Sequence, residues 1–190
     1  VNKKHTGDES YNYFLSVIFP DNQMNIMAYN RVLKDLNNHT PEALLKNLNE
    51  IFYIEKIEAK DPEEAKPKKI GDFSIFLNHT WYLLTIKPEL IPLNDPVNSL
   101  DVAILQNKVL GPIFGIEDPR TNNRIDFVGG IRGLKELVKR CEFDCKVAFA
   151  LFPTSINQLI EVANAGKVMP PKSTWFEPKL RSGLIVRPLD

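Results

Sequence analysis

The sequence predicts an α+β fold with a mixed sheet, in which a hairpin-rich N-terminal part precedes a β-α-β-α C-terminal part. Two observations support this fold class. Residues 52–86 contain strand-like runs separated by turn residues, which is typical of hairpins. From residue 125 onward, short apolar runs alternate with stretches of helical periodicity, which favours alternating strands and helices. We expect one domain over residues 1–190, with a subdivision into residues 1–97 and 98–190 as the alternative.

Two strands and a helix are expected at the start of the chain. The run YNYFLSVIFP, from Tyr11 to Pro20, is aromatic and β-branched and ends in a Pro-Asp-Asn turn, so it predicts a buried strand. A second strand is expected within MNIMAYNRVLKDL. The triplet Thr40-Pro41-Glu42 marks a helix start, because Thr is a favoured N-cap, Pro fits the first helical position and an acid suits the first turn.

The middle of the chain predicts a strand, a loop and a hairpin. Residues 52–59, FYIEKIEA, alternate in polarity and indicate a strand. Residues 59–69, AKDPEEAKPKK, are charged and contain proline, so this segment is the best candidate for disorder. Residues 73–86 form two strand-like runs around Asn78-His79, which predicts a hairpin turn there.

Three further helices and three short strands are expected in the rest of the chain. The first helix covers LDVAILQNKVLGPIFG and is expected to be capped by Asn98 or Ser99. The second, IRGLKELVKRC, lies between the strands IDFV and KVAFALF. The third, INQLIEVANA, begins with Ser155 and Gln158 at capping-box spacing. A last strand is expected in LIVRPL.

Composition and charge narrow the classes of function. The 24 basic residues equal the 24 acidic ones, so the zero net charge argues against a protein that coats nucleic acid. No run approaches the roughly 18 apolar residues of a membrane helix, and the polar start VNKKHTGDES is not a signal peptide. We therefore expect a soluble, cytoplasmic protein without a membrane partner. The chain begins with Val1 rather than Met and is expected to be part of a longer protein.

The cysteines and histidines predict no metal site. Cys141 and Cys145 are the only cysteines, and in a reducing cytosol they are expected to be free thiols. His5, His39 and His79 lie far apart in polar or turn contexts, whereas zinc ligands must converge. No Ser-His-Asp or Cys-His set is evident, so the sequence identifies no catalytic nucleophile.

Two strand–turn–helix junctions in the last third are candidates for anion binding. If their strands are parallel in one sheet, both helix N-termini lie at the same edge, and helix N-termini favour anions. At the first junction Gly130 permits close backbone approach and Arg132 lies in the first turn. At the second, Thr154 and Ser155 provide hydroxyls. A tight packing turn and a plain N-cap are the respective alternatives.

The segment EDPRTNNRID adds two guanidinium groups before the first junction. Arg120 and Arg124 flank a Thr-Asn-Asn turn, and guanidinium groups bind phosphate or carboxylate in a bidentate manner. In an extended chain Arg124 and Asp126 share a face, so a structural salt bridge is the alternative.

The segment MPPKSTWFEPKLRSG combines bases, hydroxyls and large aromatics near the end of the chain. A plain linker would not carry Trp175-Phe176, and a core strand would not carry three cations and three prolines. We interpret it as an anion-facing loop held by its aromatics, with a solvated surface loop as the alternative. The candidate ligand-binding residues are thus Arg120, Arg124, Gly130, Arg132, Ser155, Lys172, Ser173 and Thr174, and the candidate general bases are Asp126 and Glu177.

Three long motifs resemble a known family. YNRVLKDLN, DPRTNNRIDFVGG and MPPKSTWFEPKLRSG are similar, in order and spacing, to the C-terminal half of the bacterial and archaeal domain-of-unknown-function family 1015. The resemblance covers essentially the whole chain. Family members usually also have an N-terminal half with an Asp-Gly-His-His-Arg motif, which resembles the phosphate-binding motif of the ParB/sulfiredoxin-like fold that includes free-serine kinases. This chain has no such motif.

The resemblance implies a nucleotide- or phosphate-linked, serine-kinase-like role for the intact protein. It implies ATP, ADP or pyrophosphate with magnesium as candidate ligands, and the N-terminal half of the same protein as a partner. One hypothesis is an enzyme of phosphoryl transfer in which the bases orient phosphate, the fragment alone being inactive. The other is a non-catalytic module that stabilises the larger protein or forms a homo-oligomer. Bases that converge on one cavity favour the enzyme, and scattered or carboxylate-paired bases favour the module.

Overall fold

The computed structural model describes residues 6–179 and 181–188 and divides the chain into two compact units. One unit is Ile26–Trp175 and contains a six-stranded sheet and the four α-helices. The other combines the chain up to Asn25 with the chain from Phe176 onward. The predicted α+β class is confirmed. The six-stranded sheet takes strands from both halves of the sequence.

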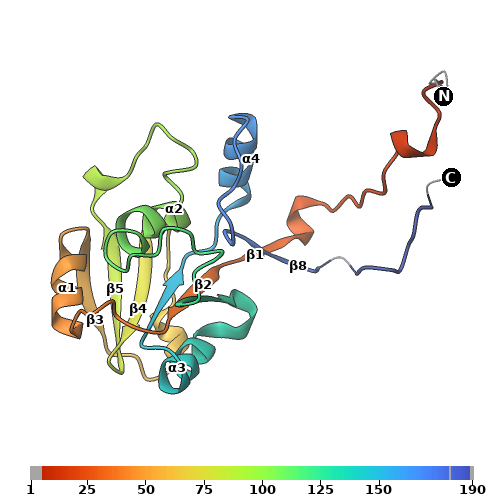
Figure 1. Ribbon diagram of the computed structural model, residues 1–190. Helices are drawn as coiled ribbons and strands as arrows, with labels where there is room; N and C mark the ends of the chain where they lie inside the picture. Colours follow the sequence, from red (N-terminus) through yellow and green to blue (C-terminus); the bar gives the residue numbers. More distant parts are fainter. Residues whose placement is uncertain (1–5, 180, 189–190) are drawn as a thin grey trace. The chain divides into compact units, whose positions relative to one another are not determined.

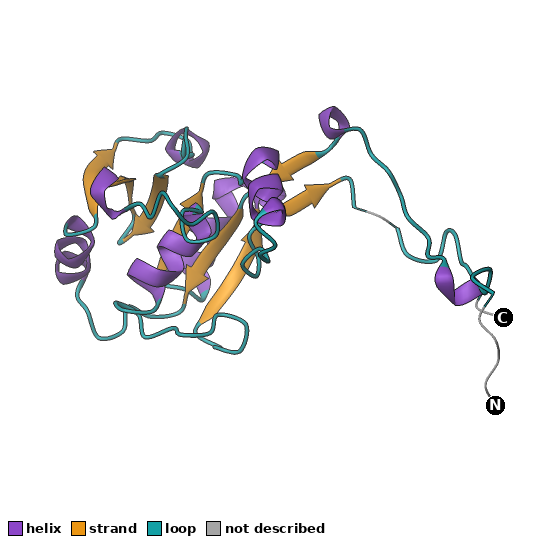
Figure 2. Cartoon of the chain, turned by 90° about the horizontal axis from the view of Figure 1, so that it is seen from above, coloured by secondary structure: helices purple, strands orange, loops and turns teal. Residues whose placement is uncertain are grey.

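The sheet has the strand order β3-β5-β4-β7-β2-β6. Figure 1 labels its strands β2 to β5, and Figure 2 draws the strands in orange. Each of its neighbouring pairs is antiparallel. Its strands are β2 (Tyr29–Leu33), β3 (Phe52–Ile57), β4 (Asp72–Leu77), β5 (Thr80–Ile86), β6 (Ile125–Gly129) and β7 (Val147–Leu151). Two further strands, β1 (Asn25–Met27) and β8 (Trp175–Glu177), pair with each other in a separate two-stranded sheet.

The position of β2 explains why the sheet is antiparallel where the sequence favoured a mixed one. β2 lies between β6 and β7 and is antiparallel to both, so these two strands point in the same direction without pairing. Their C-terminal ends therefore lie at one edge of the sheet, together with the start of β2. Tyr29 pairs with Gly129 at this edge, and β7 ends there at Leu151. We call this end of the strands the Gly129 edge.

The opposite edge of the sheet is where β6 and β7 begin. Leu33, the last residue of β2, pairs with both Ile125 and Val147 at this edge. Leu77, the last residue of β4, also pairs with Val147. We call it the Leu77 edge. The two edges are the two ends of the same strands. A residue that precedes β6 therefore lies at the Leu77 edge, and a residue that follows β6 lies at the Gly129 edge.

Helices cover both faces of the sheet (Figure 1). They are α1 (Pro41–Asn49), α2 (Asp101–Leu105, continued by a π-helical turn over Gln106–Leu110), α3 (Gly133–Phe143) and α4 (Ile156–Asn164). Leu44 and Leu48 of α1 and Ile104 of α2 join the main core on one face of the sheet. Leu134 and Leu137 of α3 belong to a second core on the other face. The apolar side chains of α1 are therefore part of the core.

Two of the predicted helix caps are confirmed. Thr40 Oγ1 accepts a hydrogen bond from the N–H of Ala43 at 3.2 Å at the start of α1. Ser155 Oγ accepts one from the N–H of Gln158 at 3.2 Å, and Gln158 Oε1 accepts one from the N–H of Ser155 at 3.0 Å. This reciprocal pair is the predicted capping box of α4.

The predicted cap of α2 is wrong. The helix begins at Asp101, after Leu100, and has no side-chain cap. Asn98 is occupied elsewhere, because its Nδ2 donates to Asp95 Oδ2 at 2.9 Å within the turn that precedes the helix. A local hydrogen bond to an acid three residues earlier competes with capping.

The hairpin predicted at Asn78-His79 is confirmed and joins β4 to β5. Asn78 has φ 46° and His79 has φ 60°. Positive φ at both central residues is the geometry of a type I′ turn, whose twist matches that of the flanking strands. The strands predicted over residues 52–59, 125–128 and 146–152 are also present, as β3, β6 and β7.

The strand predicted over residues 11–20 is absent. A 3-10 turn spans Ser10–Asn12, and the rest of the run belongs to no strand, with Phe14 85% and Ile18 90% exposed. An apolar, β-branched run becomes a strand only where a neighbour pairs with its backbone. The strand predicted in LIVRPL is likewise not formed over residues 184–188, and its last residue lies outside the described residues.

Residues 59–69, predicted to be disordered, are ordered. They contain a 3-10 turn over Pro62–Ala65. Glu63 Oε1 accepts a hydrogen bond from the N–H of Leu134 at 2.5 Å, in the first turn of α3. The carboxylate of Glu63 thus contacts a helix residue 71 positions away, and composition does not reveal such a contact.

Neither a membrane helix nor a metal cluster is found in the described part of the chain. None of the helices there combines the length and the apolar character needed to span a membrane. The His, Cys, Asp and Glu side chains of the same residues form no group of three or more suited to a metal ion. Cys141 and Cys145 are free thiols.

Candidate anion-binding site

The predicted ligand-binding residues lie at both edges of the sheet. Gly130 and Arg132 follow β6 at the Gly129 edge, whereas Arg124 precedes β6 at the Leu77 edge. The extended chain from Arg124 to Gly130 spans roughly 20 Å at about 3.3 Å per residue. One small anion therefore does not contact both groups.

Arg120 and Arg132 lie in local ion pairs on the surface. Arg120 Nε and Nη2 donate to the two carboxylate oxygens of Asp118 at 2.9 and 2.8 Å, and this bidentate contact lowers the pKa of Asp118 to about 2. Arg132 Nη1 lies 3.6 Å from Glu136 Oε1, one turn further along α3. Exposed pairs contribute little to stability, but an anion bound at either arginine would compete with a neighbouring carboxylate.

Arg124 is the centre of a partly buried network. Its Nε donates to Asp35 Oδ2 at 2.8 Å, its Nη1 to the carbonyl oxygen of Phe114 at 2.9 Å, and its Nη2 to Asn37 Oδ1 at 3.3 Å. The hydrogen bond from Arg124 lowers the pKa of Asp35. Each of the three guanidinium nitrogens thus has a protein acceptor, and the network ties the start of β6 to the connection that follows β2.

Asp126 pairs with Arg140 of α3 rather than with Arg124. Arg140 Nη1 donates to Asp126 Oδ2 at 2.8 Å. Partial burial raises the pKa of Asp126, but hydrogen bonds from Arg140 and from the N–H of Phe127 outweigh burial, so its pKa is below the ordinary value. A lowered pKa makes a carboxylate a weaker general base at neutral pH. The other candidate base, Glu177, belongs to the smaller unit, which contains the chain from Phe176 onward.

The glycine pair after β6 permits close packing. The N–H of Gly130 donates to the carbonyl oxygen of Ala28 at 2.8 Å, and a Cβ on Gly130 would lie 2.9 Å from the same oxygen. A Cβ on Gly129 would overlap the ring of Trp175. Both positions therefore need glycine because another part of the chain lies against their backbone.

Arg31 is a buried cation on β2 that sequence analysis did not single out. It is 4% exposed. Its Nη1 donates to the carbonyl oxygen of Tyr29, its Nη2 donates to the carbonyl oxygen of Lys172 at 3.0 Å, and its Cζ lies 5.3 Å from the centre of the Phe127 ring. Burial lowers the pKa of Arg31 to about 10, so it stays protonated at neutral pH. Among the described residues no carboxylate pairs with it.

Lys172 lies against the same aromatic side chains. Its Nζ is 5.4 Å from the centre of the Tyr29 ring and 5.9 Å from that of the Phe127 ring, within the range of cation–π attraction. The ring of Trp175 packs edge-on against Tyr29, with centres 5.2 Å apart. Trp175 therefore anchors the segment, as the sequence predicted, while Lys172 is exposed above the rings.

The hydroxyl groups of this region hold the loop in place. Thr154 Oγ1 donates to the carbonyl oxygen of Ser173 at 3.2 Å, and both residues are buried. Ser155 is used by its capping box, and Thr174 is half-buried. The predicted residues that lie at the Gly129 edge are thus Gly130, Arg132, Ser155, Lys172, Ser173 and Thr174, with Arg31 in addition, and Arg132 among them is paired with Glu136.

A sequence signal for Arg31 did exist. Tyr29, Arg31 and Leu33 lie on one face of β2 by the two-residue period of a strand, and Leu33 is core. An arginine in an inward register of an apolar strand is unusual, because charged side chains are rarely fully buried. What sequence spacing could not supply is the loop around Lys172 that covers it.

Comparisons with known proteins address the family rather than the activity. The model of the family described as "Protein of unknown function (DUF1015)" matches residues 1–103. No curated protein matches the chain.

Solved structures with partial similarity include two complexes of mutant free serine kinase, one with AMP (17% identity, TM-score 0.45) and one with ADP (16% identity, TM-score 0.45). Each covers 81% of this chain and 54% of the other. A conserved hypothetical protein from Pyrococcus furiosus has 17% identity and a TM-score of 0.46, over 82% of this chain and 57% of that one. The chain thus spans about half the length of these structures, and similarity at this level does not define an activity. Because the family model covers more than half of its residues, the chain belongs to the family of proteins of unknown function DUF1015.

Proposed function

We propose that the Gly129 edge binds an anionic group of a small molecule, a phosphate or a carboxylate, and that the chain contributes this site to a longer protein. One observation carries the proposal. Arg31 is a buried, protonated side chain without a carboxylate partner in the described part of the chain, and it adjoins the exposed Lys172. Both cations lie against the Phe127 ring.

The cost of burying a cation gives the physical argument. Removing an ionised group from water is expensive unless an opposite charge compensates it. Arg31 has two neutral carbonyl acceptors and the face of Phe127, but no carboxylate of the described residues pairs with it. An anion held by Lys172 would supply that charge nearby, and its attraction to Arg31 is strengthened by the low dielectric of the surrounding protein.

The start of α4 adds to the positive potential at the same edge. The helix begins at Ile156, a short connection after β7 ends at Leu151, and a helix N-terminus carries a partial positive charge. The groups of Ser155 and Gln158 are already hydrogen-bonded to each other. α4 therefore contributes its dipole rather than a free hydroxyl.

Phosphate-bearing ligands are the first candidates for this edge. A lysine, an arginine and a helix N-terminus are the groups that proteins use for phosphate, so ATP, ADP and pyrophosphate with magnesium are the compounds to try. In its wider form, the proposal makes the chain part of a phosphotransferase that acts on a small hydroxyl substrate such as L-serine. We assign no catalytic base to it, because Asp126 is ion-paired away from this edge.

A thermal-shift experiment on the full 190-residue chain tests the proposal. ATP, ADP, pyrophosphate, inorganic phosphate and L-serine are compared with and without magnesium, since a ligand that binds only the folded state raises the melting temperature. We expect a shift with at least one phosphate compound that is lost in Lys172→Ala and retained in Lys139→Ala, an exposed lysine of α3. A shift that survives Lys172→Ala, or none with any compound, would contradict the proposal.

A second candidate function is that of an assembly module, which the exposed apolar side chains of the smaller unit favour. Phe14 is 85% exposed, Ile18 90%, Leu184 78% and Val186 75%. Exposed apolar groups clustered in sequence are typical of interaction segments. Sedimentation equilibrium over a range of concentrations tests this function. We expect self-association that the double variant Phe14→Ser/Ile18→Ser weakens, and a monomer at every concentration would exclude a homo-oligomer.

A further inference from the structure

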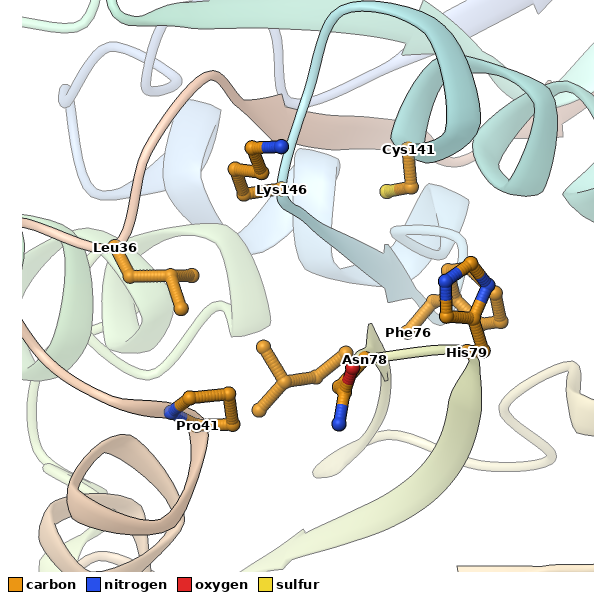
Figure 3. A pocket seen from close by; sticks show the side chains of 8 residues that line it. Leu36, Pro41, Phe76, Asn78, His79, Cys141 and Lys146 are labelled. Carbon is orange, nitrogen blue, oxygen red and sulfur yellow. The ribbon is translucent and has the colours of Figure 1, made fainter.

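A small pocket lies at the Leu77 edge, the opposite edge from the anion site proposed above. Its volume is about 200 Å³. It is lined by residues of the connection after β2, the start of α1, the β4–β5 hairpin, α3 and the start of β7. The lining residues are Leu36, Pro41, Phe76, Leu77, Asn78, His79, Cys141 and Lys146. Figure 3 shows Leu36 and Pro41 on one side of the pocket and Phe76 and His79 on the other.

The lining of the pocket combines an apolar wall with a few polar groups. Four of its residues are aliphatic, aromatic or proline, and Phe76 and Leu77 among them are buried. Asn78 offers an amide, His79 an imidazole N–H and Lys146 an ammonium group. Small-molecule sites have this composition, in which the apolar wall provides affinity and the polar groups fix orientation.

The charge of the lining favours an anion. None of the eight described residues that line the pocket is Asp or Glu, and no ion pair joins Lys146 to a carboxylate in the described part of the chain. Cys141 adds no negative charge, because burial raises the pKa of its thiol to about 12. The ammonium group of Lys146 is thus the uncompensated charge of the lining.

The backbone at the rim of the pocket supports a function for His79. Asn78 and His79 have φ values of 46° and 60°, and the turn that needs such values favours Asn-Gly. A histidine at the second position holds its backbone in the left-handed region at a cost that glycine avoids. Such conformations cluster at functional sites, and here the side chain that makes the turn less favourable lines a pocket.

We propose that this pocket binds a small organic anion, a carboxylate or a phosphate carried on a compact apolar body. Lys146 contacts the charged group. The side-chain amide of Asn78 and the imidazole N–H of His79 donate hydrogen bonds to the oxygens of that group. The apolar body lies against Leu36 and Phe76. This proposal is independent of the one made for the Gly129 edge, because the two sites share no residue.

Isothermal titration of the full 190-residue chain with four probes tests the proposal. Benzoate and phenyl phosphate carry the two anionic groups on one apolar body, benzamide has the shape of benzoate without its charge, and inorganic phosphate lacks the apolar body. We expect benzoate or phenyl phosphate to bind about tenfold more tightly than both benzamide and inorganic phosphate, the factor expected for one charge-assisted hydrogen bond. The better of the two organic anions identifies the head group.

Three variants locate the binding. Lys146→Met is expected to raise the dissociation constant of the organic anion by about tenfold, while the control Lys139→Met leaves it unchanged. His79→Gly weakens binding without lowering the melting temperature, because glycine suits the turn. Equal affinity for benzoate and benzamide, binding that survives Lys146→Met, or no heat with any of the four probes would overturn the proposal.

Discussion

Arg31 Nη2 donates a hydrogen bond at 3.0 Å to the carbonyl oxygen of Lys172, a residue 141 positions away in the sequence. Lys172 has a left-handed backbone with φ 54°, which a lysine rarely adopts unaided. The hydrogen bond holds that backbone in place while the Nζ of Lys172 lies over Tyr29 and Phe127. The buried Arg31 therefore positions the exposed Lys172.

Replacing Arg31 by methionine tests the structural part of this relationship. Methionine fills part of the space but leaves the carbonyl oxygens of Tyr29 and Lys172 without their donor, so we expect Arg31→Met to lower the free energy of unfolding by about 1–3 kcal/mol. Urea denaturation measures it. The control Arg132→Met removes an exposed side chain and should change stability by less than about 0.5 kcal/mol. Equal effects of the two variants would rule out the special role of Arg31.

Arg124 is expected to stabilise the fold without contributing to the proposed ligand site. We expect Arg124→Met to lower the free energy of unfolding by about 1–2 kcal/mol, because a charge-assisted network is lost but Asp35 is partly exposed to solvent. The phosphate-induced rise in melting temperature should be unchanged, in contrast to Lys172→Ala. If Arg124→Met instead kept its stability and lost the ligand effect, the ligand site would include the Leu77 edge.

The buried carboxyl group of Asp101 is expected to make the free energy of unfolding depend on pH. Its carboxylate oxygens accept hydrogen bonds from the N–H of Gly71 at 3.0 and 3.2 Å, and the residue is 7% exposed. Burial raises the pKa of Asp101 to about 7, and the nearby Asp72 acts in the same direction. The folded state thus holds the proton more tightly than the unfolded chain, whose value is about 3.9. This stabilisation is complete below about pH 4 and is lost as the pH rises through about 7.

Urea unfolding at several pH values tests the sign. Between about pH 5 and pH 8 we expect the wild-type unfolding free energy to fall relative to that of Asp101→Asn, by the order of a few kcal/mol. Asp95→Asn is the control, because the hydrogen bond from Lys167 lowers the pKa of Asp95 to about 2, outside this window. Parallel pH profiles for wild type and Asp101→Asn would contradict the raised pKa.

Glu63 caps α3 from outside the helix. Its Oε1 accepts a hydrogen bond from the N–H of Leu134, and the residue at the N-cap position of α3 offers no side-chain cap. We expect Glu63→Ala to lower the free energy of unfolding by about 1 kcal/mol, the usual value of an N-cap, and to speed hydrogen exchange at the Leu134 amide. Glu64 accepts a hydrogen bond from the N–H of Lys60 instead, so Glu64→Ala should leave hydrogen exchange at the Leu134 amide unchanged.

Local features of this protein were predictable because their causes lie within a few residues. Thr40 and the Ser155–Gln158 pair cap their helices through hydrogen bonds that reach three residues at most. The turn at Asn78-His79 follows from two apolar runs separated by a polar pair that begins with Asn78, a residue type that tolerates positive φ. The α+β class rests on such local signals.

The partners of Arg124 and Arg31 were decided by the tertiary structure. Arg124 and Gly130 lie at opposite edges of the sheet because they flank one extended strand, β6, but the residues that meet them at each edge come from distant parts of the sequence. Arg124 finds Asp35 at a separation of 89 positions, and Arg31 finds Lys172 at 141. Sequence spacing predicts which residues share a face of one element. Strand order determines which elements become neighbours, and it depends on the packing of the whole core, so the site followed only from the three-dimensional structure.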